Sequence, residues 1–124
     1  VVVPERRSAG MSAVAWKASA GAAARTPVTQ IRNLVATIQE VQKEGYFVIV
    51  LDADGEALIG ELAAATEPLL LIVGGEGKGL SRLVREHCDL VVSIPMSSEM
   101  ESLNASIAAA IALFSISEKR KAIK

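Results

Sequence analysis

The sequence predicts an α/β domain with a mostly parallel sheet flanked by helices. Two observations carry this prediction: the expected strands are apolar throughout, and they alternate along the chain with segments of helical periodicity. Continuous apolar runs are typical of strands buried on both faces, as in parallel sheets covered by helices. The 124 residues suffice for one domain, and a hydrophobic content of 51% excludes disorder as the general state.

The beginning of the chain is predicted to hold four short segments. Alanine favours helix, and short valine-rich runs favour buried strands. We expect a strand over Val1–Val3 and a loop over Pro4–Gly10. An alanine-rich helix over Ser12–Ala24 and an extended segment over Pro27–Ile31 should follow. A clearer helix follows over Asn33–Glu44, where apolar residues recur at helical spacing. Asn33 suits its N-cap, and Gly45 suits the position that ends it.

The remainder of the chain alternates strands with helices. Apolar runs predict three strands, over Tyr46–Leu51, Leu69–Val73 and Leu90–Ile94. Between the first two strands we expect a turn over Asp52–Gly55 and a short helix over Leu58–Ala65. A helix capped by Ser81 is expected over Ser81–Cys88, and an almost wholly apolar helix follows the last strand over Asn104–Ser117. A helix that is apolar on all sides must be buried all round, by its own sheet, a threaded segment or a partner chain.

Composition excludes several classes of protein. The 3% aromatic content leaves few rings on which single-stranded bases could stack. A single cysteine, Cys88, makes no internal disulfide and is interpreted as a buried structural thiol in a reducing compartment, so we expect a cytoplasmic protein. One histidine, His87, builds no zinc site, and the longest uncharged run is too short and too polar to span a bilayer. We therefore expect no metal and no membrane association.

Charge is unevenly distributed along the chain. Residues 1–32 carry five basic residues against one acidic, residues 33–101 carry four against twelve, and residues 102–124 carry four against one. The basic head and tail have two open interpretations. They are solvated surface charges, or they contact the phosphates of a nucleic acid.

Two loops follow predicted strands, where parallel sheets bind their ligands. The first, Gly74–Ser81, is glycine-rich but has the spacing of neither a Walker loop nor a dinucleotide fingerprint. Its Glu76 would repel a phosphate, so a neutral or cationic ligand fits better, although a plain structural loop stays open. The second runs over Pro95–Leu103, and Ser102 or Asn104 is expected to cap the helix after it.

The two loops together carry a family resemblance. Leu71-Ile72-Val73-Gly74-Gly75-Glu76-Gly77-Lys78-Gly79-Leu80, then Ser93-Ile94-Pro95-Met96 and Ser102-Leu103-Asn104-Ala105-Ser106-Ile107-Ala108, closely resemble the second and third motifs of SpoU/TrmH-type RNA ribose 2′-O-methyltransferases of the SPOUT class. The segments Lys17–Ala22 and Arg85–Asp89 resemble the branch that modifies a guanosine in 23S ribosomal RNA.

The resemblance implies an α/β fold with a C-terminal deep trefoil knot, S-adenosylmethionine bound in the knot, and a homodimer. Its target would be a ribose 2′-hydroxyl of RNA, with 23S rRNA expected first and tRNA second. The positions that match cofactor-binding residues of the family are Gly74, Gly79, Ile94, Met96 and Leu103. Those that match residues of the catalytic pocket are Glu76, Ser102 and Asn104.

The sequence departs from the family at one place. The first motif, Asn-x-Gly-x-x-x-Arg, is absent, so we expect residues 1–124 to be an N-terminally truncated, cofactor-binding catalytic domain that lacks its first strand, first helix and first motif. Such a chain is expected to bind the cofactor but to methylate poorly unless a longer chain supplies the motif. Two alternatives stay open: a noncatalytic knotted module for RNA binding and dimerisation, and a nucleotide-binding α/β domain.

Overall fold

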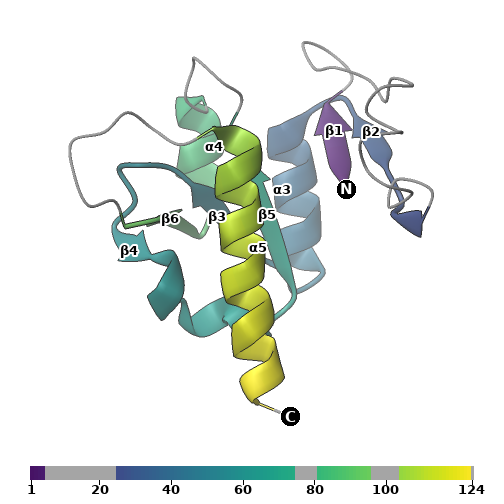
Figure 1. The fold of residues 1–124 in the computed structure, drawn as a ribbon. Helices are drawn as coiled ribbons and strands as arrows, with labels where there is room; N and C mark the ends of the chain where they lie inside the picture. The colour runs from purple at the N-terminus through teal and green to yellow at the C-terminus, as the bar shows by residue number, and fades with distance from the viewer. Residues whose placement is uncertain (5–24, 75–80, 96–103, 124) are drawn as a thin grey trace. The chain divides into compact units, whose positions relative to one another are not determined.

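The computed structural model describes residues 1–4, 25–74, 81–95 and 104–123, and its backbone confirms an α/β fold with parallel strands (Figure 1). Residues 1–37 and 38–124 form two compact units, which are described separately. The predicted helix over Ser12–Ala24 lies outside the described residues.

The first unit contains a two-stranded parallel pair and the start of a helix. Strand β1 (Val2–Pro4) pairs with β2 (Thr29–Ile31), with Val2 opposite Thr29, so both predicted extended segments are confirmed. Helix α3 (Leu34–Lys43) begins as predicted at Asn33, whose Oδ1 accepts a hydrogen bond from the Ala36 amide at 3.0 Å.

The second unit is built on a four-stranded parallel sheet. Its strands are β3 (Phe47–Leu51), β4 (Ala57–Leu58), β5 (Leu69–Val73) and β6 (Leu90–Ser93), in the order β4-β6-β3-β5. The chain reaches β5 on one side of β3 and then crosses to β6 on the other side. The central strand β3 therefore lies between the two strands that precede the predicted loops.

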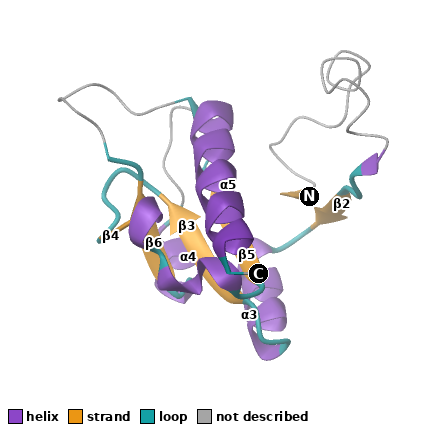
Figure 2. Ribbon diagram, turned by 60° about the horizontal axis from the view of Figure 1, so that its bottom comes forward, coloured by secondary structure: helices purple, strands orange, loops and turns teal. Residues whose placement is uncertain are grey.

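Helices cover both faces of this sheet. Helix α5 (Ala105–Ala122) lies on one face, and the part of α3 from Ile38 onward lies with α4 (Arg82–His87) on the other, as the two views agree (Figures 1 and 2). On the α5 face, a buried cluster joins the sheet to α5 and includes Ile49, Val92, Ala112 and Ile116. Because side chains alternate along a strand, Val48 and Val50 face the opposite layer, and both are fully buried.

Local signals correctly placed the end of α3 and the start of α4. Gly45 has a φ of +97°, and the amides of Gly45 and Tyr46 donate to the carbonyls of Gln42 and Val41, which ends α3 in a Schellman motif. Ser81 caps α4 through a 3.3 Å bond from the Val84 amide. Each of these signals is a bond within a few residues, which explains why the sequence reveals it.

The prediction of one short helix over Leu58–Ala65 is confirmed only in part. This segment holds strand β4 followed by two 3₁₀ turns, η1 (Ile59–Glu61) and η2 (Ala63–Thr66), which are separated at Leu62 by an extended backbone. Ile59, Leu62 and Ala65 are buried and lie three residues apart. The two 3₁₀ turns, joined through the extended Leu62, bring all three side chains into the buried cluster that also contains Ala112 and Ile116.

Helix α5 runs five residues further than the predicted Asn104–Ser117. Its last turns contain Glu118, Lys119, Arg120 and Lys121, all of which favour helix. Arg120 donates from Nε to the Ala65 carbonyl at 2.8 Å and from Nη2 to the Glu67 carbonyl at 2.6 Å. Lys121 lies 3.4 Å from Glu118. Part of the basic tail is therefore engaged in protein contacts and is not simply solvated.

Candidate functional site

The described part of the site lies at the carboxyl edge of the four-stranded sheet. Gly74 follows β5 and Ile94 follows β6, and both residues are half-buried. Leu51, at the end of β3, stands opposite Val73 of β5 and opposite Val92 of β6. Because the strands are parallel, Gly74 and Ile94 emerge at the same edge, on either side of the end of β3, as the sequence predicted.

Asn104 marks a third part of the site, at the start of α5. Arg120 ties the far end of α5 to the carbonyls just before β5, and α5 contacts β5 itself, so the two elements run in opposite directions. Sixteen helical residues rise about 24 Å, which is close to the length of an extended chain from Glu67 to Gly74. The first turn of α5 therefore lies near the carboxyl edge, which Figure 1 shows.

The Asn104 side chain caps α5. Its Oδ1 accepts hydrogen bonds from the amides of Ser106 at 2.8 Å and Ile107 at 3.4 Å, and from the Ser106 hydroxyl at 2.5 Å. The predicted capping role is thus confirmed for Asn104. The cap also fixes the orientation of the carboxamide, so any contact that Asn104 makes with a ligand is pre-organised by the helix.

Five predicted site residues, namely Glu76, Gly79, Met96, Ser102 and Leu103, lie outside the described residues. The structure therefore brings together Gly74, Ile94 and the start of α5, and the other five assignments stay predictions.

The turn after β3 also lies at this edge of the sheet. Its predicted Asp52–Gly55 span is confirmed by a 3.0 Å bond from the Gly55 amide to the Asp52 carbonyl. A Cβ atom added at Gly55 would lie 2.3 Å from the carbonyl carbon of Val92 and 2.6 Å from the amide nitrogen of Ser93. The turn thus packs its backbone directly on β6, immediately before Ile94.

Asp52 and Arg85 form an ion pair at this edge to which the sequence assigned no role. Arg85 Nη1 donates to Asp52 Oδ2 at 2.5 Å, and the Asp54 amide donates to Asp52 Oδ1 at 3.2 Å. The Asp52 amide in turn donates to the Val92 carbonyl at 2.9 Å. An aspartate directly after an all-apolar strand was the only available signal, because its partner is 33 residues away.

Cys88 is half-buried, not fully buried as expected, and it plays a structural part. Its Sγ donates to the Arg85 carbonyl at 3.0 Å. Burial raises the pKa of the Cys88 thiol above its ordinary value, so the thiolate that a nucleophile needs is disfavoured.

The described residues contain neither a cluster suited to a metal ion nor a helix suited to crossing a membrane. Within residues 1–4, 25–74, 81–95 and 104–123, no three histidine, cysteine or acidic side chains are arranged to hold a metal ion. In the same part of the chain, no helix combines the length and hydropathy that crossing a bilayer requires.

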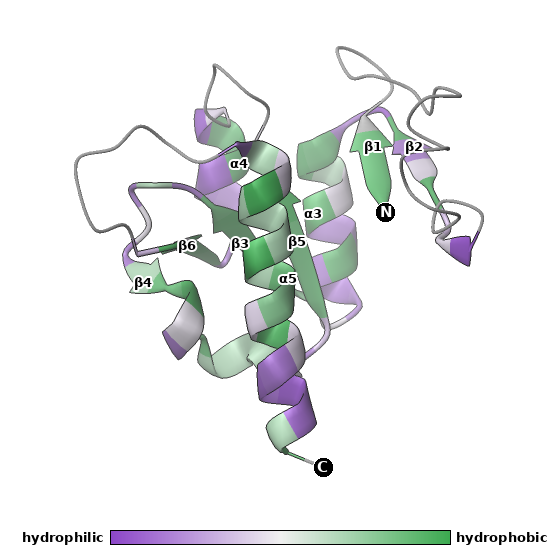
Figure 3. Ribbon diagram, viewed as in Figure 1, coloured by the Kyte–Doolittle hydropathy of each residue, from purple (hydrophilic) through white to green (hydrophobic). Residues whose placement is uncertain are grey.

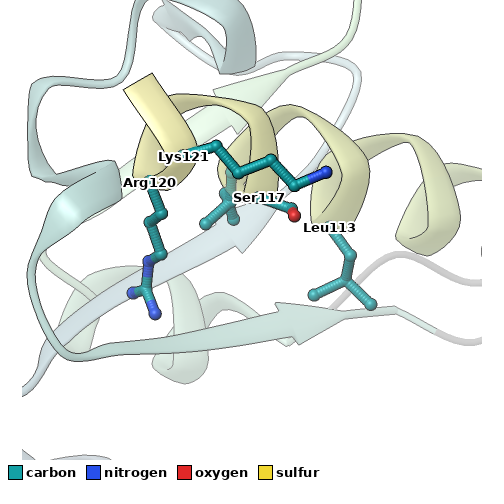
Figure 4. A pocket seen from close by; sticks show the side chains of 5 residues that line it. Leu113, Ser117, Arg120 and Lys121 are labelled. Atoms are coloured by element: carbon teal, nitrogen blue, oxygen red, sulfur yellow. The ribbon is translucent and has the colours of Figure 1, made fainter. Parts of the chain in front are cut away.

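A shallow groove of about 460 Å³ runs along the C-terminal half of α5 (Figure 4). It is lined by Leu113, Ile116, Ser117, Arg120 and Lys121. None of the predicted site residues that the structure describes lies in it.

Comparison with known proteins gives concordant findings. The sequence profile of the SpoU rRNA Methylase family matches residues 1–114. An uncharacterized tRNA/rRNA methyltransferase of Mycolicibacterium paratuberculosis is 54% identical over 121 residues, which are 98% of this chain and 39% of the relative. The chain therefore spans about two fifths of that relative's length.

Solved structures share the fold. The SpoU methyltransferase AviRb from Streptomyces viridochromogenes, in complex with the cofactor AdoMet, superposes with a TM-score of 0.88 at 25% identity, over 98% of this chain and 49% of its own. The TrmH/SpoU tRNA modifying enzyme of A. aeolicus superposes with a TM-score of 0.82 at 24% identity, over 98% of this chain and 62% of its own.

Proposed function

The chain belongs to the SpoU rRNA methylase family, and we propose that it forms the cofactor-binding part of an RNA methyltransferase that uses S-adenosylmethionine. One observation carries the proposal. The segments with the family's second and third motifs leave the same carboxyl edge of a parallel sheet, at Gly74 and Ile94. This is the edge at which open α/β sheets bind ligands.

The residues at this edge fit an adenosyl ligand. Ile94 offers an apolar surface for adenine, and Gly74 lets the backbone approach the ligand closely. The Asp52 carboxylate is already paired with Arg85, so it places no unpaired charge at the edge. We assign Gly74, Gly79, Ile94, Met96 and Leu103 to cofactor binding, and Glu76, Ser102 and Asn104 to the catalytic pocket.

The proposed reaction is transfer to a ribose 2′-hydroxyl. The 2′ oxygen attacks the methyl carbon of the sulfonium, so that the O–C bond forms, the S–C bond breaks, S-adenosylhomocysteine leaves and the hydroxyl proton passes to a base. A hydroxyl is a weak nucleophile, so the protein must hold it in line with the S–CH₃ bond. The fixed carboxamide of Asn104 is suited to such positioning, and Glu76 suits a cationic sulfonium by charge.

The finer assignments are part of the same proposal. We assign the substrate to a guanosine of 23S rRNA, with tRNA as the alternative, and the fold to a C-terminal trefoil knot in a cytoplasmic protein. The motif resemblance supports the substrate and the knot, and the single cysteine supports the location.

Titration calorimetry tests cofactor binding. We expect S-adenosylmethionine and S-adenosylhomocysteine to bind the chain saturably, and ATP not to bind. A Gly74→Val variant should weaken binding roughly tenfold or more, about 1.4 kcal/mol, because a branched side chain blocks the close approach of the backbone. Gly60→Ala is the matched control, because Gly60 is exposed and nothing lies within 4 Å of an added Cβ.

Two results would contradict this expectation. Binding of ATP in place of the adenosyl-sulfur ligands would favour a nucleotide-binding domain. No binding of any of the three ligands would reject the cofactor proposal for this chain and leave the noncatalytic module.

We further propose that the chain forms a homodimer through α5. Ile107, Ile111 and Phe114 form an apolar stripe at i, i+4 and i+7, and all three are exposed. By helical spacing, the stripe lies on the side of the helix opposite the buried Ala112 and Ile116. Figure 3 shows that most of α5 before its last turns is coloured as hydrophobic. Among the described residues, this side of α5 has no cover, and a second copy of the chain packed on the stripe would supply one.

Light scattering after gel filtration tests the dimer. We expect wild type at twice the 13.0 kDa of one chain and Phe114→Glu at the mass of one chain. Phe114 is 67% exposed, so the charge should break an interface and leave the fold intact. Leu83→Glu is the control, because Leu83 is 57% exposed on α4. A monomeric wild type, or a Phe114→Glu variant that stays dimeric, would reject the α5 interface.

A further inference from the structure

We propose that the ion pair between Asp52 and Arg85 is a positioning pair for the cofactor site. Through Arg85 it holds α4 against the centre of the carboxyl edge of the sheet, and through the backbone bond between Arg85 and Ser81 it sets the spacing between Gly74 and Ser81, the two ends of the glycine-rich segment. The inference rests on the proposed function and adds two residues that the family motifs do not supply.

The pair lies at the centre of the site. Asp52 is the first residue after β3, and β3 lies between β5 and β6. Since Leu51 stands opposite Val73 and Val92, Asp52 is level with Gly74 on one side and with Ser93 on the other. Asp52 therefore lies between the points where the two motif segments leave the sheet.

Hydrogen bonds fix both the side chain and the backbone of Asp52. One carboxylate oxygen accepts from Arg85 and the other from the Asp54 amide, while the Asp52 amide is tied to β6 through Val92. Its side chain is 18% exposed, and that of Arg85 is 33% exposed. Solvent and salt screen such a pair less than a surface pair, and removing one partner leaves the other charge partly buried and unpaired.

Helix α4 depends on such an anchor. It has six residues, too few to be stable alone, and only Val84 among them is buried. Gln42 Nε2 donates to the His87 carbonyl at 2.9 Å and so fixes the C-terminal end of the helix. The Asp52–Arg85 pair holds Arg85, whose backbone amide bonds to Ser81, the last residue of the glycine-rich segment.

Arg85 is coupled directly to Ser81. The Arg85 amide donates to the Ser81 carbonyl at 3.2 Å, and the Ser81 hydroxyl caps the same turn through Val84. A displacement of Arg85 therefore moves Ser81 relative to Gly74. Because both ends of the segment must be fixed for its backbone to bind a ligand, loss of the pair should weaken cofactor binding more than it weakens the fold.

Helix α4 supplies its own control. Arg82 lies 3.0 Å from Glu86 in a second ion pair, but these side chains are 88% and 51% exposed and contact solvent. Surface pairs of this kind contribute little to stability. Arg82→Gln thus removes an arginine and an ion pair from the same helix without touching the edge of the sheet.

The experiment is a calorimetric titration with S-adenosylmethionine, well below the thermal midpoint of every variant. We expect Arg85→Gln and Asp52→Asn each to raise the dissociation constant roughly tenfold. Together they should raise it no more than either alone, because the two residues act as one unit. Arg82→Gln should bind as wild type does. Arg85→Lys, which keeps the charge, should recover part of the affinity and serves if the other variants fold poorly.

The outcomes separate this inference from the proposed function. If wild type does not bind the cofactor, both fail. If wild type binds it and Arg85→Gln, Asp52→Asn and Arg85→Lys bind equally well despite lowered thermal midpoints, the pair is merely structural and only this inference fails. Effects of Arg85→Gln and Asp52→Asn that multiply in the double variant would also reject the pair as one unit.

Discussion

Replacing Asn104 with serine is expected to abolish most methyl transfer while leaving the stability of the chain nearly unchanged. A serine hydroxyl can still accept from the amides of the first turn of α5, so the helix cap is kept. The carboxamide is lost, and with it the group that we propose to orient the ribose. A small misplacement of reacting groups reduces rates by about 100-fold, and we expect a loss of that order.

Asn104→Ala separates the two roles of this residue. It removes both the cap and the carboxamide, so it should lower the free energy of unfolding by about 1 kcal/mol in addition to the loss of transfer. Transfer is to be measured in a chain that also carries the first motif, together with RNA affinity and dimer mass, which should stay nearly constant. If Asn104→Ser retains wild-type transfer, Asn104 acts only as a helix cap. If no transfer is found in the parent chain, the noncatalytic alternative holds.

Gly55→Ala is expected to destabilise the second unit by about 3 kcal/mol. The added Cβ would overlap Val92 and Ser93, and the atoms that it meets are backbone atoms of β6. They cannot shift without disturbing the pairing of β6 with β3 and β4. Forcing extra volume into packed structure typically costs 1–3 kcal/mol, and here a flexible side chain is not available to absorb it.

Urea unfolding followed by circular dichroism measures this effect, with Gly60→Ala as the control. Nothing lies within 4 Å of a Cβ at Gly60, so its free energy of unfolding should stay within about 0.5 kcal/mol of wild type. Cofactor affinity should fall in Gly55→Ala as well, because β6 leads directly into Ile94. Equal stability of the two variants would show that the turn and β6 separate without cost.

The candidate site was predicted from sequence where the signal was contiguous. The Gly74 and Ile94 segments were recognised because each motif is an unbroken run next to an apolar strand. The Asp52–Arg85 pair was not, because nothing in either local pattern indicates a partner 33 residues away. The close packing of Gly55 on β6 was missed for the same reason, since a glycine in a turn has many explanations.

Strands β3, β5 and β6, the helix caps and the family could be predicted from the sequence. Phe47–Leu51 and Leu69–Val73 are apolar at every position, and Asn33, Ser81 and Asn104 bond to amides two or three residues away. Such interactions are complete within a few residues, so they can be read from a short stretch of sequence.

The strand order β4-β6-β3-β5, the 3₁₀ turns over residues 59–66 and the ion pair at the edge depend instead on the tertiary structure. Each of these depends on burial against, or a bond to, a segment distant in sequence. Distant contacts form only when the chain has folded, and they override local propensity wherever burial outweighs it, as Ile59, Leu62 and Ala65 show.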